Sequence, residues 1–209
     1  MAFKGFTPED FNVFHIAGLE ERMAGIRERI QPKFREIAEE LSGDLTALAG
    51  KEMYLHIAKH ARRTVNPPVD TWLAFSPNKR GYKQYPHFQI GLFDDRVFIW
   101  LACIYEIADK AAVADRLLAG IDRIRDALPE DAQLSTDHMK KGAGDVSAMN
   151  RSDWESALHR FRNVKNAELL IGRQIAKDDP IVHDGERFIA LARGMMRQLA
   201  PIYKLAAGE

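Results

Sequence analysis

The chain has 209 residues, and its 30 lysine and arginine residues balance 30 aspartate and glutamate residues, so the formal net charge is zero. Hydrophobic residues make up 46% and charged residues 29%, which is typical of a globular protein and predicts a single domain over residues 1–209. The neutral charge argues against a dedicated nucleic-acid-binding protein, and the longest apolar run, residues 97–105, is too short for a membrane-spanning helix.

The beginning of the chain carries no sign of a secretory signal, because MAFKGFTPEDF contains acidic side chains and no long apolar stretch. Cys103 is the single cysteine, and it lies within the apolar run. A lone cysteine cannot form a disulfide within the chain, and its apolar surroundings are typical of a small core residue. We therefore expect a cytoplasmic protein with no membrane partner.

The first part of the chain predicts helices. Residues 7–10, Thr-Pro-Glu-Asp, form a helix-start signal with the threonine as the capping residue. Between residues 19 and 41 the apolar positions recur every three or four residues, which indicates one helix face, and Pro32 is expected to kink or split that helix. A shorter helix is expected over about residues 51–64.

The middle of the chain changes to β-branched and aromatic residues, which are typical of strands. We expect strands over residues 71–76, 87–93 and 96–106. Asp94-Asp95 could close a two-residue hairpin between the last two strands. That turn predicts the pairs His87 with Ala102, Gln89 with Trp100, and Gly91 with Phe98.

The last part of the chain alternates helical and strand patterns. The helical period returns after Asp109 and is stopped by Pro129, and a final helix is expected from about Asp184. Between them we expect short strands at 133–139 and 167–175, a loop at 140–145, a helix opened by a capping box at residues 152–155, and a surface ion-pair set of Lys165, Glu168 and Arg173. Together these elements predict an α+β fold, in which an antiparallel β-sheet packs with several α-helices.

The basic residues are concentrated in one segment. Residues 51–92 contain seven basic residues and two acidic ones, whereas the rest of the chain is slightly acidic. A local positive excess attracts an anion even where the overall charge is zero. The seven basic residues are Lys51, Lys59, Arg62, Arg63, Lys79, Arg80 and Lys83.

The two adjacent arginines receive different roles on the expected helix of residues 51–64. Arg62 would lie at the edge of the apolar face, where its guanidinium can reach a carboxylate or a ligand oxyanion. Arg63 would point to solvent and stabilise the last helical turn, where a positive charge is favourable. Asn66-Pro67-Pro68 would end the helix and make the chain leave it in an extended form.

One face of the expected hairpin could form the floor of a pocket. His87, Gln89 and Gly91 would share that face with Trp100, because alternate residues of a strand point to the same side. A basic loop with Tyr82 precedes this hairpin. The alternative is a half-exposed sheet, in which the glycine only makes room for the phenylalanine opposite it.

The first functional hypothesis is that the chain binds a small anionic or phosphorylated ligand, with nucleic acid as a variant of the same idea. Basic side chains would neutralise the anion, Tyr82 or Trp100 would stack on a ring, and His87 and Gln89 would donate hydrogen bonds. The sequence determines neither a cofactor nor an oligomeric state. The candidate ligand-binding residues are Arg62, Lys79, Arg80, Tyr82, Lys83, His87, Gln89 and Trp100.

Two other hypotheses stay open. The chain could be an enzyme that uses His87 or His60 as a general acid–base, with Asp70 orienting the histidine. Alternatively, the arginines could form internal ion pairs, such as Arg62 with Asp70 or Glu106, in a structural or protein-interaction module.

Known catalytic and metal-binding motifs are not found. His56 and His60 have the spacing of two metal ligands on one helical turn, but HIAKH lacks the glutamate of the zinc-protease motif. A third ligand would have to come from elsewhere, such as His87 or Asp70, so we expect no metal site. The sequence contains no nucleophile elbow, P-loop or dinucleotide-binding fingerprint, and it identifies no catalytic residue.

Three segments resemble one protein family. GFTPEDFNVF at 5–14, HIAKHARRTVNPPVDTWLAFSPNKRGYKQYPHFQIGLF at 56–93 and NVKNAELLIGR at 163–173 are similar to the YktB-like family of uncharacterised bacterial proteins. The resemblance spans essentially the whole chain. It implies a compact α+β fold in a bacterial cytoplasm, and it implies no activity, cofactor or catalytic residue.

Overall fold

The computed structural model describes residues 2–209, and it begins with the predicted helices. Helix α1 (Pro8–Asn12) starts at Thr7, whose backbone N–H donates to Asp10 Oδ2 at 2.7 Å, which confirms the helix-start signal. The next helix is continuous from Leu19 to Ala49, and the disturbance expected at Pro32 takes the form of a π-helical turn that ends just before this proline, which lacks an N–H. The bounds are a 3-10 turn at Val13–His15, α2 at Leu19–Gly25, the π-helical turn at Ile26–Ile30 and α3 at Gln31–Ala49.

Within residues 2–209 the strands form one seven-stranded sheet of order β1-β2-β3-β4-β7-β5-β6, and every neighbouring pair is antiparallel. The predicted hairpin register is confirmed, because Gln89 pairs with Trp100 and Gly91 pairs with Phe98. The two residues 144 and 145 were expected in a loop but form a short edge strand. The bounds are β1 Tyr54–Ile57, β2 Thr71–Ser76, β3 His87–Leu92, β4 Arg96–Cys103, β5 Gln133–Ser135, β6 Gly144–Asp145 and β7 Leu169–Ala176.

The prediction of a helix over residues 51–64 is wrong. Residues 54–57 form β1, which pairs with β2 so that His56 lies opposite Ala74, and residues 58–70 form the long connection to β2. The pattern of Tyr54 to Ile57 fits a strand as well as a helix, and the free edge of β2 decides in favour of the strand. The helix-based roles of the two arginines therefore do not apply, and Arg63 instead donates to the carbonyl oxygen of Asn66 at 3.4 Å.

Among the remaining helices the structure differs from the prediction in three places, of which the first is the short helix α7 (Pro180–His183), which the sequence does not predict. The helix expected before Pro129 is divided at Gly120 into α4 and α5. Helix α6 is capped by Asn150 with Asp153, two residues earlier than predicted, because the Asn150 side chain accepts the backbone N–H of Asp153. The bounds are α4 Lys110–Ala119, α5 Ile121–Ala127, α6 Arg151–Asn163, α7 Pro180–His183 and α8 Gly185–Ala207, with further 3-10 turns at Tyr82–Gln84 and Val146–Ala148.

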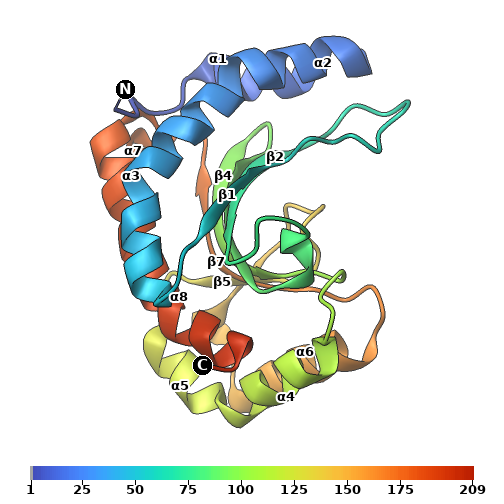
Figure 1. Ribbon diagram of the computed structural model, residues 1–209, viewed down its shortest axis with the longest axis vertical. Coiled ribbons are helices and arrows are strands. Elements are labelled where there is room, and N and C mark those ends of the chain that lie inside the picture. Colours follow the sequence, from blue (N-terminus) through green and yellow to red (C-terminus); the bar gives the residue numbers. More distant parts are fainter. Residues whose placement is uncertain (1) are drawn as a thin grey trace.

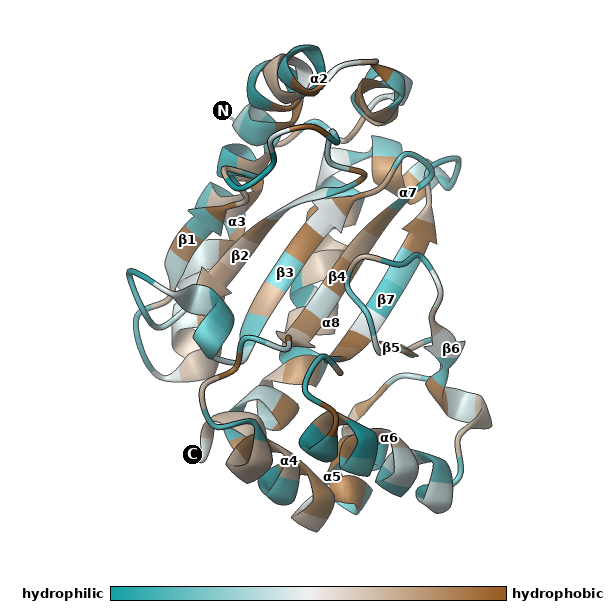
Figure 2. Ribbon diagram, turned by 90° about the vertical axis from the view of Figure 1, so that its right-hand side faces the viewer, coloured by the Kyte–Doolittle hydropathy of each residue, from teal (hydrophilic) through white to brown (hydrophobic). Residues whose placement is uncertain are grey.

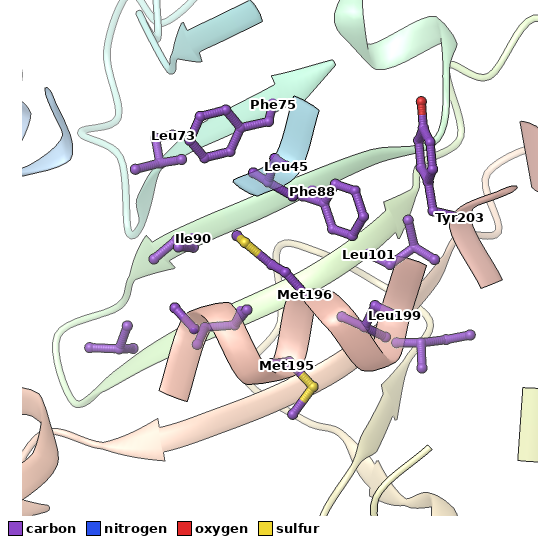
Figure 3. Close-up of a cluster of buried hydrophobic side chains, with 14 of the residues drawn as sticks. Leu45, Leu73, Phe75, Phe88, Ile90, Leu101, Met195, Met196, Leu199 and Tyr203 are labelled. Atoms are coloured by element: carbon purple, nitrogen blue, oxygen red, sulfur yellow. The ribbon is translucent and has the colours of Figure 1, made fainter. Parts of the chain in front are cut away.

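One face of the sheet is covered by helices and buries the main core. Helices α3 and α8 lie along this face (Figure 1). Figure 3 shows side chains of β2, β3 and β4 meeting those of α8, and the rings of Phe88 and Tyr203 lie 5.1 Å apart. Cys103 is buried in this core, as predicted, and burial raises the pKa of its thiol to about 12.

The opposite face carries a second, smaller cluster of buried side chains that includes Trp72, Phe98 and Trp100. In Figure 2 this face is turned toward the viewer, and connecting segments rather than long helices cross it. Helices on one side of an antiparallel sheet and loops on the other confirm the predicted α+β class. The expectation of a single domain stays a prediction. In residues 2–209 no helix is long and apolar enough to cross a membrane.

Gly91 provides a test of the packing on the loop-covered face. A Cβ atom on Gly91 would lie 2.3 Å from Phe98 Cζ and 2.5 Å from the carbonyl oxygen of Thr71. Because neither neighbour can withdraw without disturbing the sheet, Gly91→Ala is expected to lower the free energy of unfolding by about 1–3 kcal/mol. Chemical denaturation measures this change.

Gly194→Ala in α8 is the matched control, because nothing lies within 4 Å of its added Cβ. Alanine favours helix over glycine by about 1 kcal/mol, so this variant is expected to be as stable as the natural chain or slightly more stable. Equal stability of the two variants would contradict the packing described for Gly91.

Candidate functional site

A pocket of about 790 Å³ opens on the loop-covered face of the sheet. Its wall comes from five segments that are far apart in the sequence: β1 with the connection after it, β2, the β2–β3 connection, the segment after β4, and the β5–β6 loop. Folding of the sheet therefore creates the pocket. The lining residues are 55–63, Trp72, Lys79, Tyr82, Lys83, Tyr105, Glu106, His138 and Met139.

Positive side chains dominate the described part of this wall. Five lysine and arginine residues line the pocket against one carboxylate, that of Glu106. Lys83 Nζ lies 3.4 Å from Glu106 Oε1, so one of the five cations is already paired. Arg62 has no carboxylate within ion-pair distance in residues 2–209, and its side chain is exposed. The five cationic residues are Lys59, Arg62, Arg63, Lys79 and Lys83.

Trp72 is the central aromatic residue of the wall. Its Nε1–H donates to the hydroxyl oxygen of Tyr82 at 2.9 Å, which fixes the orientation of the indole. Lys83 Nζ lies 5.4 Å from the centre of the Trp72 ring, within the range of a cation–π contact. Tyr82 in turn stacks on His56, with ring centres 4.7 Å apart, and burial raises the pKa of Tyr82 to about 12. The neutral phenol can therefore serve as a hydrogen-bond donor over the physiological pH range.

His60 contacts Trp72 and has an unusual backbone conformation. Its φ angle is +50°, which non-glycine residues adopt rarely, and its ring packs edge-on against the indole at 5.5 Å. Its Nε2 lies 3.2 Å from Thr71 Oγ1. Burial, with help from the charges of Arg63 and Lys83, lowers the pKa of His60 to about 4. The ring is therefore neutral at physiological pH.

His138 also contacts Trp72, with ring centres 5.9 Å apart, and pairs with the buried carboxylate of Glu168. The ring Nδ1 of His138 is 2.7 Å from Glu168 Oε2, and the backbone N–H of His138 donates to the same oxygen at 2.7 Å. A third N–H, from the backbone of Tyr105, donates to Glu168 Oε1 at 3.3 Å. These bonds compensate the burial of a carboxylate that is only 3% exposed.

Asp70 lies beside the pocket without a hydrogen-bond partner. It is 1% exposed, and neither of its carboxylate oxygens has a partner in residues 2–209. Burial raises the pKa of Asp70 to about 6, although the charges of His138, Arg63 and Lys83 oppose this shift. A carboxylate that loses its water without gaining hydrogen bonds favours its protonated form.

Comparisons with known proteins place the chain in a family. A family model described as a domain of unknown function, DUF1054, matches residues 6–203. The UPF0637 protein of Oceanobacillus iheyensis is 52% identical over 202 residues, which cover 97% of this chain and 96% of that protein. The UPF0637 protein of Shouchella clausii is 51% identical over 206 residues, covering 99% and 96%, and that of Listeria monocytogenes serovar 1/2a is 46% identical over 206 residues, covering 99% of each.

The chain belongs to the DUF1054 family. This agrees with the resemblance to the YktB-like family, and the relatives named above are bacterial proteins. Their descriptions name no ligand and no reaction, so the function of this DUF1054 chain has to be argued from its pocket.

The eight candidate residues fall into three groups in the DUF1054 chain. Four of them line the pocket together, Arg80 is exposed on the same connection but outside the pocket, and three lie buried in the sheet beneath it. The four lining residues are Arg62, Lys79, Tyr82 and Lys83, and the three buried ones are His87, Gln89 and Trp100, each at most 3% exposed.

The buried histidine forms a closed hydrogen-bond chain. His87 Nδ1 donates to the carbonyl oxygen of Tyr85 at 2.7 Å, and Gln89 Nε2 donates to His87 Nε2 at 2.8 Å. Both ring nitrogens are therefore used, and burial lowers the pKa of His87 to about 4. Asp70 bonds to neither His87 nor His60, so the arrangement set out above for an enzyme, with Asp70 orienting one of these histidines, is absent from residues 2–209.

The metal arrangement considered for His56 and His60 is also not formed. The two residues do not share a helical turn, and His56 Nε2 donates to the carbonyl oxygen of Asn78 at 2.8 Å. In residues 2–209 the one group with metal-ligand proximity is Asp137, His138 and Glu168, whose ligand atoms lie within 4.8 Å of one another. The carboxylate oxygens of this group already accept hydrogen bonds from the protein. The His138 ring and backbone donate to Glu168, and the Met139 N–H donates to Asp137.

Sequence reasoning missed the residues that complete the pocket. Glu168 was expected in a surface ion-pair set but is buried against His138, thirty positions away, and Arg173 pairs with Asp131 instead. No local spacing connects two residues so far apart. Trp72 could have been predicted as a pocket residue if the pairing of β2 with β3, in which it lies opposite Gly91, had been known. The connection between these strands is long, so the sequence does not determine that register.

Asp70→Asn tests the electrostatics of the pocket. The pKa of Asp70 in the folded chain, about 6, exceeds the ordinary value of 3.8, so folding binds the proton more tightly. The stability that Asp70 contributes is therefore full below about pH 4 and is lost as the pH rises through 6. Each pKa unit corresponds to about 1.4 kcal/mol. The unfolding free energy of Asp70→Asn, relative to that of the natural chain, should therefore rise by about 3 kcal/mol between pH 4 and pH 7.5.

Urea denaturation at a series of pH values measures this growth. Asp178→Asn, at an exposed position, is the matched control and should show no comparable pH dependence. A pH-independent difference between Asp70→Asn and the natural chain would show that the carboxyl group is not held in the environment described here.

Proposed function

We propose that the chain binds a small anionic ligand in this pocket, with a phosphoryl or carboxylate group held by the basic side chains. The observation that carries this proposal is the convergence of five cationic residues and one carboxylate on a single pocket of a chain with no net charge. Cations that converge in a cleft raise the local concentration of anions, because the low-dielectric wall strengthens the field between them.

The pairing of the cations supports ligand binding over a purely structural role. Arg62 has neither Asp70 nor Glu106 as an ion-pair partner, and Asp70 has no hydrogen bond at all. Lys79 lies over the ring of Tyr54 at 5.0 Å and likewise has no carboxylate partner in residues 2–209. Internal ion pairs, the alternative considered above, therefore account for Lys83 but not for these two cations.

The aromatic wall adds a preference for a ligand with a planar ring. Trp72, Tyr82 and Tyr105 line the same pocket as the cations. Aromatic side chains bind rings by stacking and edge contacts, each worth about 0.5–1.5 kcal/mol beyond the burial of apolar area. A volume of about 790 Å³ lies in the range of small-molecule sites and suits a nucleotide-sized ligand.

The proposed location is the bacterial cytoplasm. The named relatives are bacterial proteins, and a single buried cysteine is compatible with a reducing compartment.

Phenyl phosphate is a suitable probe, because it combines a phosphoryl group with an aromatic ring. Isothermal titration calorimetry at low salt should detect binding to the natural chain, and Arg62→Ala or Lys79→Ala should each weaken it about threefold to tenfold through loss of one positive charge at the pocket. Raising the ionic strength to 0.5 M should weaken binding further, because salt screens partly exposed charges.

Arg80→Ala is the matched control, since this arginine is exposed on the same connection as Lys79 but does not line the pocket. Its affinity should stay within about twofold of the natural chain, the effect of one screened surface charge. Equal weakening by Arg80→Ala and Lys79→Ala would show nonspecific attraction to the basic segment, and undetectable binding at low salt would refute the proposed function.

A further inference from the structure

His138 is held at the pocket by a buried carboxylate. Its ring Nδ1 lies 2.7 and 2.8 Å from the two carboxylate oxygens of Glu168. A carboxylate accepts hydrogen bonds and cannot donate them, so Nδ1 carries the proton of the neutral ring and Nε2 carries the lone pair. Glu168 is 3% exposed, so water does not compete for this bond.

The lone pair of His138 is available to a molecule in the pocket. Nε2 has no hydrogen-bond partner in residues 2–209, and it is not among the unpartnered atoms that are shielded from solvent. His138 itself lines the pocket. An imidazole with a carboxylate on one nitrogen and an accessible lone pair on the other is equipped to act as a general base.

The ring of His138 is also fixed in direction. Trp72 packs against it at an interplanar angle of 79°, and the ring of Tyr105 lies roughly parallel to it, with centres 6.5 Å apart. Lys83 Nζ lies over the same indole, so a cation and the base both contact Trp72. A general base works only from a defined position relative to its substrate, and these contacts provide one.

The position of Asp70 favours a reactive site over a site that only binds anions. A buried carboxylate beside the pocket weakens the binding of an anion, so it does not serve binding alone. Asp70 interacts electrostatically with His138, and together with Glu168 it stabilises positive charge that develops on the ring during a reaction. Lys83 and Arg63 line the same pocket and attract an anionic substrate.

We propose that His138 is the general base of a hydrolytic site for phosphodiesters, with Glu168 as its positioning residue. The inference rests on the proposed function, because the cations of the pocket must first hold the substrate. A phosphodiester is a monoanion whose non-bridging oxygens gain negative charge as a nucleophile attacks. Cations that line the pocket, such as Lys83 and Arg62, stabilise that additional charge.

The proposed step is an attack by water. Nε2 of His138 removes a proton from the water molecule while the water oxygen forms a bond to phosphorus. The bond from phosphorus to one ester oxygen breaks, and its electron pair leaves with that oxygen. In the probe bis(p-nitrophenyl) phosphate the leaving group is p-nitrophenolate, the second product is p-nitrophenyl phosphate, and His138 then releases its proton to solvent.

The test measures p-nitrophenolate release and phenyl phosphate binding on the same full-length proteins. The natural chain should hydrolyse the probe, and His138→Gln should lower kcat/KM at least about 100-fold, the usual contribution of a general base, while still binding phenyl phosphate. His159→Gln, at an exposed position on α6, is the matched control and should keep the natural rate.

Glu168→Gln separates positioning from structural support when the rate is expressed per phenyl phosphate binding site, counted by calorimetry. Loss of the carboxylate leaves the His138 ring without the hydrogen bond that orients it, so kcat per binding site should fall about tenfold to 100-fold. A variant that is only less stable would have fewer binding sites and keep the natural rate per site.

If circular dichroism shows that His138→Gln does not fold, chemical modification of the natural chain tests the role of His138 instead. Diethyl pyrocarbonate acylates accessible imidazole nitrogens, so it should modify His138 in step with inactivation, and phenyl phosphate should protect against both. Modification of His138 without loss of activity would refute the inference.

Three other outcomes separate this inference from the proposed function. Phenyl phosphate binding without hydrolysis of the probe removes the general-base role and leaves the anion pocket. A rate that chelation abolishes and zinc restores also overturns the role, because a metal on these atoms would displace the proton between His138 and Glu168. Failure of the natural chain to bind phenyl phosphate removes both proposals.

Discussion

The two-residue period of the central strands is the constraint from which the rest of the structure follows. Along β2, β3 and β4, alternate side chains point to opposite faces, so each strand divides its residues between a helix-covered core and a loop-covered site. Leu73, Phe88 and Ile90 pack under α3 and α8, whereas Trp72, Gln89 and Trp100 occupy the other face. A shift of one residue in register would place tryptophan and glutamine in the apolar core.

The polar side chains beneath the pocket make its floor rigid and electrically neutral. His87 and Gln89 satisfy each other and the carbonyl oxygen of Tyr85, so these buried groups carry no charge that would compete with a ligand. The charged residues of the site lie mainly on the loops above the sheet. Most of the cations come from the connections between strands, Glu168 bonds to the His138 ring, and Asp70 interacts with that ring electrostatically. An anion in the pocket would therefore lie near both the cations and His138, whose ring bonds to the carboxylate of Glu168.

The parts of the fold that sequence reasoning found are those determined by local chemistry. Proline and aspartate positions located the helix starts, and the Asp94-Asp95 turn fixed the pairing of His87 with Ala102. The segment 51–64 was misread because its short pattern fits two structures, and only the neighbouring strand β2 decides between them. Arg62 nevertheless reaches the pocket, by way of an irregular loop rather than a helix end.

The parts of the site that sequence reasoning missed depend on distant residues. His138 and Glu168 meet because β5 and β7 are neighbours in the sheet, and Asp70 is buried at the end of the connection that leads into β2. Burial can also remove a candidate. Trp100 and His87 have suitable chemistry for a ligand, but both are at most 3% exposed and neither lines the pocket, which the two-residue period alone does not determine.

A crystal structure with bound phenyl phosphate tests the central claim most directly, since it shows where an anion lies relative to the base and the cations. The account predicts the phosphoryl group within hydrogen-bond distance of Arg62 or Lys83, on the side of His138 that carries Nε2, with the phenyl ring against Trp72. A phosphoryl group bound outside this pocket, or an empty pocket at saturating phenyl phosphate, would contradict it.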